Sequence, residues 1–537
     1  MDASKIASTV GTLSRSGLLG PLRPDRYARI VHAIRREGAG ASTGLTLSAR
    51  RCPDRPALVD ERGSLTWAQL ETRVDALAAG LVDLLGSRPG SVAVLCRNHR
   101  GFVEAFYAAS RLGADVLLLN TAFSGPQLAD VLDREGADVL IHDEEFGALL
   151  SDLPAASREL PTVLGWVEHD RDAVSVDRLI ATHRGRRAEP AARAGKIVLL
   201  TSGTTGTPKG ASREGAGIGM FVSLLERVPW RTEEAVVVAA PMFHAWGFGQ
   251  LLIGSTMSCT LVVRRRFDPE ATLAMVATHR ATGLAVVPVM LERIVDLPEA
   301  VRDRYDLSSL RFVTASGSRM RPDAVTSFMD QFGDVIYNSY NSTEVGMITA
   351  AVPADLRVAP DTAGRPVAGT ELRVLDELDK PVPVGQVGRI FARNEHPFEG
   401  YTGGGSKPFL DGFMATGDVG RLDEEGRLYV VGRDDEMIVS GGENVYPLEV
   451  EEALARHPGV LEAAVTGVDD REFGQRLEAF VVLTDTTVTP EQLRRHVRDN
   501  LAAYKVPRSI TVLDELPRNG SGKIMKRELL PRVAPKN

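Results

Sequence analysis

Cysteine is scarce in this sequence: among 537 residues only Cys52, Cys96 and Cys259 occur, far apart and with no CxxC spacing. This is evidence against a disulfide framework or a zinc site, and it agrees with a reducing compartment. Positive charge is not in excess, because the formal net charge is −8, so nothing favours nucleic acid as a partner. Apolar runs stay short of the roughly 18 residues that span a bilayer, and the N-terminus lacks the apolar core of a signal peptide. We therefore expect a cytoplasmic protein without a transmembrane segment.

What is present is an ordinary globular composition, with 43% hydrophobic and 25% charged residues, on a chain long enough for more than one domain. From residue 56 onward, short apolar runs alternate with amphipathic stretches. Runs at 92–96, 115–119, 139–142, 162–167 and 284–290 read as strands, and 101–112 and 445–456 read as helices. Such alternation predicts an α/β fold with parallel sheets and helical crossovers.

The most informative stretch is VLLTSGTTGTPKGA, residues 198–211. An apolar run that reads as a buried strand ends at Thr201, and hydroxyl residues, glycines and Lys209 follow it. Glycines let backbone N–H groups approach an anion closely, and hydroxyls and a lysine complete a site for phosphate oxygens. The loop is not a Walker sequence, because Pro208 precedes the lysine. A polar surface loop is the alternative interpretation. The candidate phosphate-binding residues are Thr201, Ser202, Gly203, Thr204, Thr205, Gly206 and Lys209.

This stretch resembles the signature of the adenylate-forming, AMP-binding superfamily, which contains acyl-CoA synthetases, luciferase-like enzymes and the adenylation domains of peptide synthetases. Further motifs of the superfamily follow in its order, over residues 56 to about 530. GGENVYP and DGFMATGD look most like bacterial medium- or long-chain fatty-acyl-CoA ligases. The resemblance implies a large N-terminal domain of parallel and mixed sheets flanked by helices with a β-barrel-like portion, residues 1–434. It implies a small mobile α+β domain at 435–537, with the hinge at Asp435.

The resemblance also implies residue roles at the nucleotide. Tyr340 would stack on adenine, Thr343 would bind the α-phosphate and the substrate carboxylate, and Glu344 would hold Mg²⁺. Asn341 stands where a glycine is common, and asparagine tolerates a positive φ. Asp418 would bind the ribose hydroxyls and Arg433 would approach ribose and phosphate. The other nucleotide neighbours carried over are Ser316, Gly317, Ser318, Arg319, Asn338, Ser339 and Ser342.

The acyl site is expected around His244, Trp246 and Phe248, with Gly317. His244 would stand on the wall between the acyl group and the nucleotide; a buried structural histidine is the alternative. Peptide-synthetase domains usually place an Asp in this region to hold their substrate's amino group, whereas residues 235–250 contain no acid. This favours a hydrophobic carboxylic acid without an α-amine, either a fatty acid or a bulky polycyclic acid. Gly247 and Gly249 are expected to leave room beside the aromatic residues.

Two further motifs would serve the mobile domain. Lys523, after Gly520-Ser521-Gly522, would bridge the substrate carboxylate and the α-phosphate during adenylation. Gly441 and Gly442 would line the channel for the pantetheine arm of CoA. Lys526 and Arg527 are interpreted as a generic basic tail.

The predicted activity is an AMP-forming acyl-CoA ligase that uses ATP, Mg²⁺ and coenzyme A. An acyl-AMP ligase that loads a separate carrier protein is the alternative, and a noncatalytic binding protein is a third hypothesis. A homodimer and the role of residues 1–50, where a basic amphipathic helix is expected at 27–36, are left open.

Overall fold

The computed structural model describes residues 3–20, 24–37, 40–151, 153, 159–168, 173–189, 191, 193–201, 209–213, 218–342, 344–394, 407–440, 443–470, 474–519 and 522–530. No helix in these ranges is long and apolar enough to cross a membrane. The chain divides into two compact units: the first comprises residues 1–360 and 367–369, and the second comprises 361–366, 370–394 and 407–537. The predicted domain boundary between 434 and 435 stays a prediction, because it marks a hinge about which one domain moves, whereas the two units are defined by their internal contacts.

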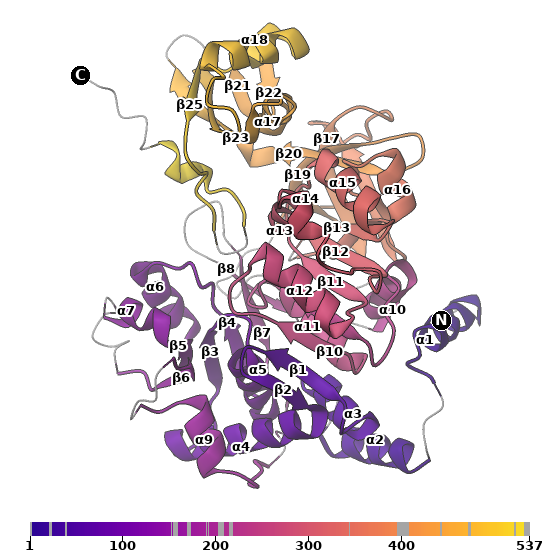
Figure 1. Cartoon of the computed structure of the whole chain (residues 1–537), viewed down its shortest axis with the longest axis vertical. Helices are drawn as coiled ribbons and strands as arrows, with labels where there is room; N and C mark the ends of the chain where they lie inside the picture. The colour runs from indigo at the N-terminus through magenta and orange to yellow at the C-terminus, as the bar shows by residue number, and fades with distance from the viewer. Residues whose placement is uncertain are drawn as a thin grey trace. The chain divides into compact units, whose positions relative to one another are not determined.

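Two sheets organise the first unit, and within the described residues both are mostly parallel (Figure 1). One runs β14-β13-β12-β11-β9-β10-β1-β2, and the other runs β6-β5-β3-β4-β7-β8. The first contains β1 (Pro56–Asp60), β2 (Gly63–Thr66), β9 (Ala235–Val238), β10 (Thr260–Val263), β11 (Gly283–Val286), β12 (Phe312–Ser316), β13 (Ile336–Ser342) and β14 (Gly346–Ala351). The second contains β3 (Ser91–Leu95), β4 (Asp115–Leu118), β5 (Val139–Asp143), β6 (Thr162–Trp166), β7 (Ile197–Thr201) and β8 (Lys209–Arg213).

Helices cover both faces of each sheet, so the unit is built in layers. In β3, Val92 and Val94 join one apolar cluster with α4 (Trp67–Leu85) and α5 (Arg100–Leu112), whereas Ala93 and Leu95 join another with α6 (Gly125–Glu135). Successive strand side chains point to opposite faces, which explains this division. The cluster around α4 and α5 also contains Val236 and Val238 of the other sheet, so the two sheets share these helices. The predicted α/β class is confirmed.

The helices of the first unit, with one 3₁₀ turn, are α1 (Ala3–Arg15), α2 (Pro24–Glu37), α3 (Thr43–Arg51), α4 (Trp67–Leu85), α5 (Arg100–Leu112), α6 (Gly125–Glu135), η1 (Glu144–Phe146), α7 (Gly147–Leu150), α9 (Val176–Thr182), α10 (Ile218–Arg227), α11 (Ala245–Thr256), α12 (Pro269–His279), α13 (Pro288–Val295), α14 (Glu299–Arg302), α15 (Pro322–Phe332) and α16 (Pro353–Val358).

The second unit holds two sheets. An antiparallel sheet runs β16-β17-β19-β18 with β20 paired to β19, within residues 1–434, for which a barrel-like portion is predicted. The other runs β22-β21-β24-β23 with β25 paired to β24. The strands of these two sheets are β16 (Thr370–Leu375), β17 (Gly388–Asn394), β18 (Phe409–Leu410), β19 (Phe413–Leu422), β20 (Leu428–Arg433), β21 (Ile438–Ser440), β22 (Glu443–Val445), β23 (Val460–Asp470), β24 (Gly474–Leu483) and β25 (Ser509–Val512); the short strand β15 (Arg365–Pro366) belongs to neither sheet.

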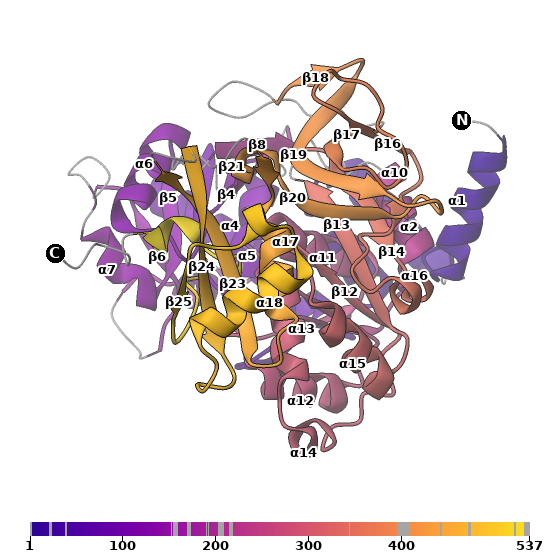
Figure 2. The same ribbon diagram turned by 90° about the horizontal axis from the view of Figure 1, so that it is seen from above.

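The C-terminal sheet is covered on both faces (Figure 2). Val465 of β23 packs with helices α17 (Pro447–Ala455) and α18 (Pro490–Asn500), whereas its neighbour Ala464 packs with Leu516 and Leu529. The chain after β25 therefore forms the second cover. Short 3₁₀ turns complete the unit at η2 (Asp434–Glu436), η3 (Ala503–Lys505) and η4 (Lys526–Glu528). The predicted small α+β domain is confirmed as a fold.

Two expected elements differ from the structure, in both cases at a proline. The run 284–290 was predicted as one strand, but β11 ends at Val286 and α13 begins at Pro288. The helix predicted to start at Val445 starts at Pro447, because Tyr446 has extended backbone angles (φ −90°, ψ 120°) as its N-cap. Proline suits the first helical position and disfavours helical geometry in the residue before it.

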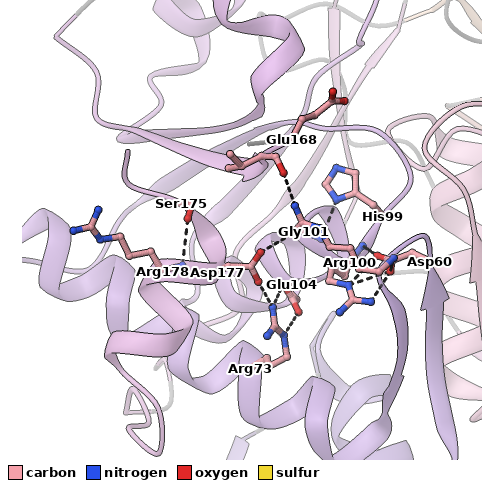
Figure 3. A network of polar contacts seen from close by, with 12 residues as sticks. Asp60, Arg73, His99, Arg100, Gly101, Glu104, Glu168, Ser175, Asp177 and Arg178 are labelled. Atoms are coloured by element: carbon pink, nitrogen blue, oxygen red, sulfur yellow. Dashed lines mark hydrogen bonds and ion pairs between the residues drawn. The ribbon is translucent and has the colours of Figure 1, made fainter. Parts of the chain in front are cut away.

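An ion-pair network that includes two fully buried carboxylates, Glu104 and Asp60, holds several elements of the first unit together (Figure 3). Arg73 of α4 donates to Glu104 of α5 at 2.5 Å and to Asp177 of α9 at 2.6 Å. The Glu104 side chain is fully buried, and burial raises the pKa of its carboxyl in spite of the arginine. A second pair joins Arg100 to Asp60 of β1 at 2.5 Å. The network therefore ties α4, α5, α9 and β1 into one body.

All three cysteines are free and buried. Cys96 lies close to His99 and Asp143, and the three could in principle ligate a metal. Both ring nitrogens of His99 already have partners, however. Nδ1 accepts from the Gly101 N–H at 3.0 Å, so Nε2 carries the proton and donates to Asp143 at 2.7 Å. Burial holds the pKa of the Cys96 thiol well above its ordinary value, which favours the neutral thiol. We interpret the three as core packing.

Candidate functional site

The predicted phosphate loop connects two paired strands. β7 ends at Thr201 and β8 begins at Lys209, and these two residues are partners in the antiparallel register. β7 is also paired in parallel with β4, so the loop follows the carboxyl end of a strand in a largely parallel sheet. Ligands of such sheets collect at this edge. Ser202, Gly203, Thr204, Thr205 and Gly206, with the side chains of Thr201 and Lys209, lie outside the described residues.

A second polar cluster lies at the carboxyl ends of β12 and β13. Ser316 and Ser339 are partners in the parallel register, and Asn341 Nδ2 donates to Ser316 Oγ at 2.8 Å. Asn341 has no positive φ and lies within β13, so it does not provide an unusual backbone angle. Its contribution is the hydrogen bond to Ser316. Within the described part of the chain, the buried Oγ1 of Thr314, Oγ of Ser339 and Oδ1 of Asn341 have no hydrogen-bond partner.

Buried polar atoms without partners are costly unless a ligand or water completes them. Three such atoms in the carboxyl-terminal halves of neighbouring parallel strands fit a polar ligand such as a nucleotide. Beside them, Gly317 has φ +107°, a conformation that glycine adopts readily and other residues rarely do. Ser318 is exposed and Arg319 is half-buried, as are Tyr340 and Ser342, while Asn338 and Glu344 are buried. Thr343 lies outside the described residues. Ser316 and residues 338–342 thus lie on adjacent strands, and residues 317–319 directly follow β12.

The predicted acyl site lies at the start of α11. His244 is the N-cap residue of this helix, and Trp246 Nε1 donates to the Val286 carbonyl oxygen at 2.9 Å. The Trp246 ring packs against Ala240, Val287 and Val289. His244 Nε2 is buried and has no hydrogen-bond partner among the described residues. Burial lowers the pKa of His244 to about 4, so its imidazole is neutral at neutral pH.

This depressed pKa predicts a pH dependence of stability. The unfolded chain protonates His244 near pH 6.5 and the folded protein only near pH 4, so the unfolded state binds more protons in this window. The free energy of unfolding should therefore fall by about 1–3 kcal/mol as the pH drops from 6.5 to 4. Urea unfolding at closely spaced pH values measures the effect. In His244→Gln the decline across this window should be shallower by that amount; an unchanged decline would contradict the assignment.

Three other residues of α11 have distinct roles. Phe248 is 4% exposed, and its ring packs edge-on against Phe106 at 4.9 Å, so it belongs to the core shared by the sheets. This placement does not favour a role in the acyl site. A Cβ on Gly247 would lie 2.3 Å from the Pro241 oxygen, so this glycine permits close packing and does not leave room. A Cβ on Gly249 would meet no described atom within 4 Å, as the prediction of room there requires.

In the second unit, Asp418, Arg433 and Asp435 form a chain of charges. Asp418 and Arg433 are partners in the β19–β20 register, and Arg433 Nη1 donates to Asp418 Oδ1 at 3.2 Å. Arg433 Nε donates to Asp435 Oδ1 at the same distance. Burial lowers the pKa of the guanidinium, but the two carboxylates outweigh it and hold that pKa above its ordinary value. The predicted ribose ligand and the predicted hinge residue are therefore joined through Arg433.

Lys523 lies on a tight loop of the second unit. Its backbone N–H donates to Asn519 Oδ1 and its carbonyl accepts from the Asn519 N–H, both at 2.9 Å. The side chain is exposed, as a lysine that acts on a separate ligand requires. Gly441 and Gly442, with Gly520 and Ser521, lie outside the described residues.

The interpretation of Lys526 as a generic basic tail was wrong. Its Nζ lies 2.8 Å from Glu451 and 3.2 Å from Glu436, and only 23% of its side chain is exposed. Arg527 is exposed, as expected. Sequence reasoning missed this cluster because the three residues are far apart in the chain. The sequence shows only that Lys526 follows Lys523 by three residues, and this spacing does not identify the carboxylates that Lys526 contacts.

The layered first unit, the small C-terminal unit and the polar edges of the parallel strands define the fold of adenylate-forming enzymes. The model of the AMP-binding enzyme family matches residues 45–402, and that of the AMP-binding enzyme C-terminal domain matches residues 449–523. The chain belongs to the AMP-binding enzyme family.

Relatives and a solved structure extend this likeness. A feruloyl-CoA synthase of an Amycolatopsis species is 33% identical over 500 residues, 90% of this chain and 97% of its own. The 3-[(3aS,4S,7aS)-7a-methyl-1,5-dioxo-octahydro-1H-inden-4-yl]propanoyl:CoA ligase of Mycobacterium tuberculosis is 33% identical over 507 residues, 89% of this chain and 96% of its own. The o-succinylbenzoate CoA synthetase of Bacillus subtilis, solved with its acyl-adenylate, superimposes with a TM-score of 0.76 at 28% identity, over 90% of this chain and 97% of its own. These likenesses support the predicted AMP-forming acyl-CoA ligase activity.

Proposed function

We propose that this AMP-forming ligase activates a hydrophobic carboxylic acid that carries a ring system and transfers it to coenzyme A. The observation that carries the proposal is the start of α11, where neutral His244, Trp246 and the open space beside Gly249 lie within six residues, and no acidic residue occurs in 235–250. An apolar, uncharged neighbourhood suits a flat or polycyclic acid and gives no partner for an α-amine. By their names, the two relatives and the solved structure act on ring-bearing acids.

The first half-reaction joins two anions. A carboxylate oxygen of the acid bonds to the α-phosphorus of ATP, and the bond from that phosphorus to the pyrophosphate oxygen breaks. Lys209, Thr343 and Lys523 are proposed to position the carboxylate and phosphate and to offset their charge, since positioning and fixed charges supply most of such catalysis. Mg²⁺, held by Glu344 together with the phosphates, would add positive charge. Asp418 is proposed to hold the ribose, and the polar edge of β12 and β13 to receive the base.

The second half-reaction releases AMP. The CoA sulfur, having lost its proton, bonds to the acyl carbon, and the carbon–oxygen bond to AMP breaks. Rotation of residues 435–537 about Asp435 is proposed to withdraw Lys523 and to bring in the Gly441–Gly442 loop, a hinge-type change. A cytoplasmic location and a homodimer stay predictions.

The test is product analysis by mass spectrometry with ATP, Mg²⁺ and CoA. The acids are ferulate, 2-succinylbenzoate, a hydroindane propanoate, octanoate and palmitate. A ring-bearing acyl-CoA as the best product supports the proposal. A fatty acyl-CoA as the best product overturns the acid class. Acyl-AMP that accumulates without acyl-CoA would favour transfer to a carrier protein.

The space beside Gly249 predicts a change in specificity. Gly249→Leu fills this space, so the KM for the best ring-bearing acid should rise about 10- to 100-fold. The reason is that displacing a small apolar part of the acid from its site costs about 1–3 kcal/mol of binding free energy. The KM for ATP should stay within about twofold of the wild-type value, since a change in the acyl site does not alter the contacts that bind ATP. Steady-state kinetics measures both. Gly249→Ala is the control and should resemble the wild type. If Gly249→Leu leaves the KM for the acid unchanged, the space does not receive the acid.

A further inference from the structure

Lys526 connects three elements of the second unit that are distant in sequence. It begins η4, three residues after Lys523, and its Nζ contacts Glu436 at the end of η2 and Glu451 in α17. Glu451 Oε1 also accepts the Val465 N–H of β23 at 2.7 Å. The side chains of Lys526 and Glu451 are 23% and 13% exposed, so this cation is largely withdrawn from water between two carboxylates. Burial lowers the pKa of Lys526, but the charges of Glu451 and Glu436 outweigh it, so the lysine stays charged.

Described residues on both sides of Lys523 are held by hydrogen bonds and an ion pair. Arg518 and Ile524 form an antiparallel bridge, and the Met525 N–H donates to the Pro517 carbonyl oxygen at 2.8 Å. Arg518 donates to the Gly522 carbonyl oxygen at 2.6 Å and pairs with Glu462 at 3.0 Å. Ile524 and Leu529 pack on Phe480 in the cluster below the sheet. A displacement of Lys526 would therefore be passed to Lys523 through a short, hydrogen-bonded segment.

Glu436, one of the two carboxylates that contact Lys526, lies beside the chain of charges formed by Asp418, Arg433 and Asp435. Glu436 directly follows Asp435, and Asp435 is joined through Arg433 to Asp418 at 3.2 Å for each pair. The predicted ribose carboxylate Asp418 is thus connected to Lys526 by paired charges and the peptide link between Asp435 and Glu436, and Lys526 is three residues from Lys523. Arg527, the next cation along, is exposed and makes no ion pair with the described residues.

We propose that Lys526 is a positioning residue, which fixes the Lys523 loop to η2 and α17 and so places Lys523 for the adenylation half-reaction. Lys526 touches neither ATP nor the acid in this proposal, which rests on the ligase function proposed above. Misplacement of a catalytic group by about 1 Å can cost on the order of 10²-fold in rate. Because Lys523 is withdrawn in the thioester half-reaction, that step should not depend on Lys526.

The experiment compares Lys526→Ala, Lys526→Arg and Arg527→Ala in the full chain, using the acid of the panel that the wild type activates best. ATP–pyrophosphate exchange measures adenylation, and single turnover of the synthetic acyl-AMP with CoA measures thioester formation. Lys526→Ala should lower kcat for exchange about 10- to 100-fold with the KM for ATP within about twofold. Lys526→Arg, which keeps the charge, should recover most of the rate, and Arg527→Ala should match the wild type. The thioester step should stay within about threefold in all three variants.

Glu436→Gln tests whether Lys526 acts through its contact with Glu436. If Lys526 acts through Glu436, the double variant Lys526→Ala with Glu436→Gln should be no slower than Lys526→Ala alone. Hydrogen exchange of the backbone amides of 522–525 gives a readout that needs no substrate: it should be faster in Lys526→Ala and unchanged in Arg527→Ala. Two results in Lys526→Ala would overturn the positioning role. One is an equal loss of rate in both half-reactions; the other is an unchanged rate of ATP–pyrophosphate exchange together with unchanged amide protection. Failure of the wild type to activate any acid would instead count against the proposed function.

Discussion

Replacement of Lys523 by alanine should lower the rate of acyl-AMP formation by about 10²–10³-fold, the usual cost of one charge-stabilising group at a reacting centre. The physical reason is that the incoming carboxylate and the α-phosphate are both anionic, and a compact cation between them lowers their repulsion most at the transition state. The exposed side chain on a tight loop is suited to this task. ATP–pyrophosphate exchange measures the adenylation rate directly.

The same variant should form acyl-CoA from synthetic acyl-AMP at nearly the wild-type rate. This split separates an adenylation lysine from a residue needed for folding. Arg527→Ala is the matched control, because it removes a nearby exposed cation from the same segment. Adenylation in Lys523→Ala at more than a tenth of the wild-type rate would remove Lys523 from its proposed role.

Removal of Arg73 should destabilise the protein by about 3–5 kcal/mol, since it leaves the fully buried carboxylate of Glu104 without its ionic partner. The change would also free Asp177 of α9 from its contact with α4. Urea unfolding of Arg73→Ala, followed by circular dichroism, measures the loss. Because a chain of this size need not unfold in one step, the midpoint of the first transition is the quantity to compare.

A surface ion pair provides the comparison. Arg304 and Glu270 lie 2.9 Å apart with side chains 55% and 41% exposed, so Arg304→Ala should cost less than about 1 kcal/mol. Equal effects of Arg73→Ala and Arg304→Ala would show that burial of Glu104 does not control the stability of this network.

The class of fold followed from local pattern, because strands such as β3 and helices such as α5 have strong periodicity and clear ends. The boundaries that were misplaced, at Pro288 and Pro447, lie where apolar residues continue across a proline and hydropathy alone does not show the change. The family was predictable because its motifs are contiguous, as in residues 198–211.

Contacts between distant residues were not predictable in the same way. The hydrogen bond from Asn341 to Ser316 needs the register of β12 and β13, and Phe248 turns into the core because of its position on α11 opposite Phe106. Lys526 reaches Glu436 across 90 positions in sequence. The finer resemblance to fatty-acyl-CoA ligases stays a prediction, since the depth of an acyl site depends on side chains from several segments.

The burial of all three cysteines makes the protein suitable for site-selective labelling. Burial raises the pKa of the Cys259 thiol to about 12 and also raises those of Cys52 and Cys96, so little reactive thiolate is present near neutral pH. A maleimide dye should therefore react mainly with cysteines introduced at exposed positions, such as Arg280→Cys in the first unit and Arg527→Cys in the second. Energy transfer between two such dyes could follow the proposed rotation about Asp435 through a catalytic cycle without first removing a native cysteine.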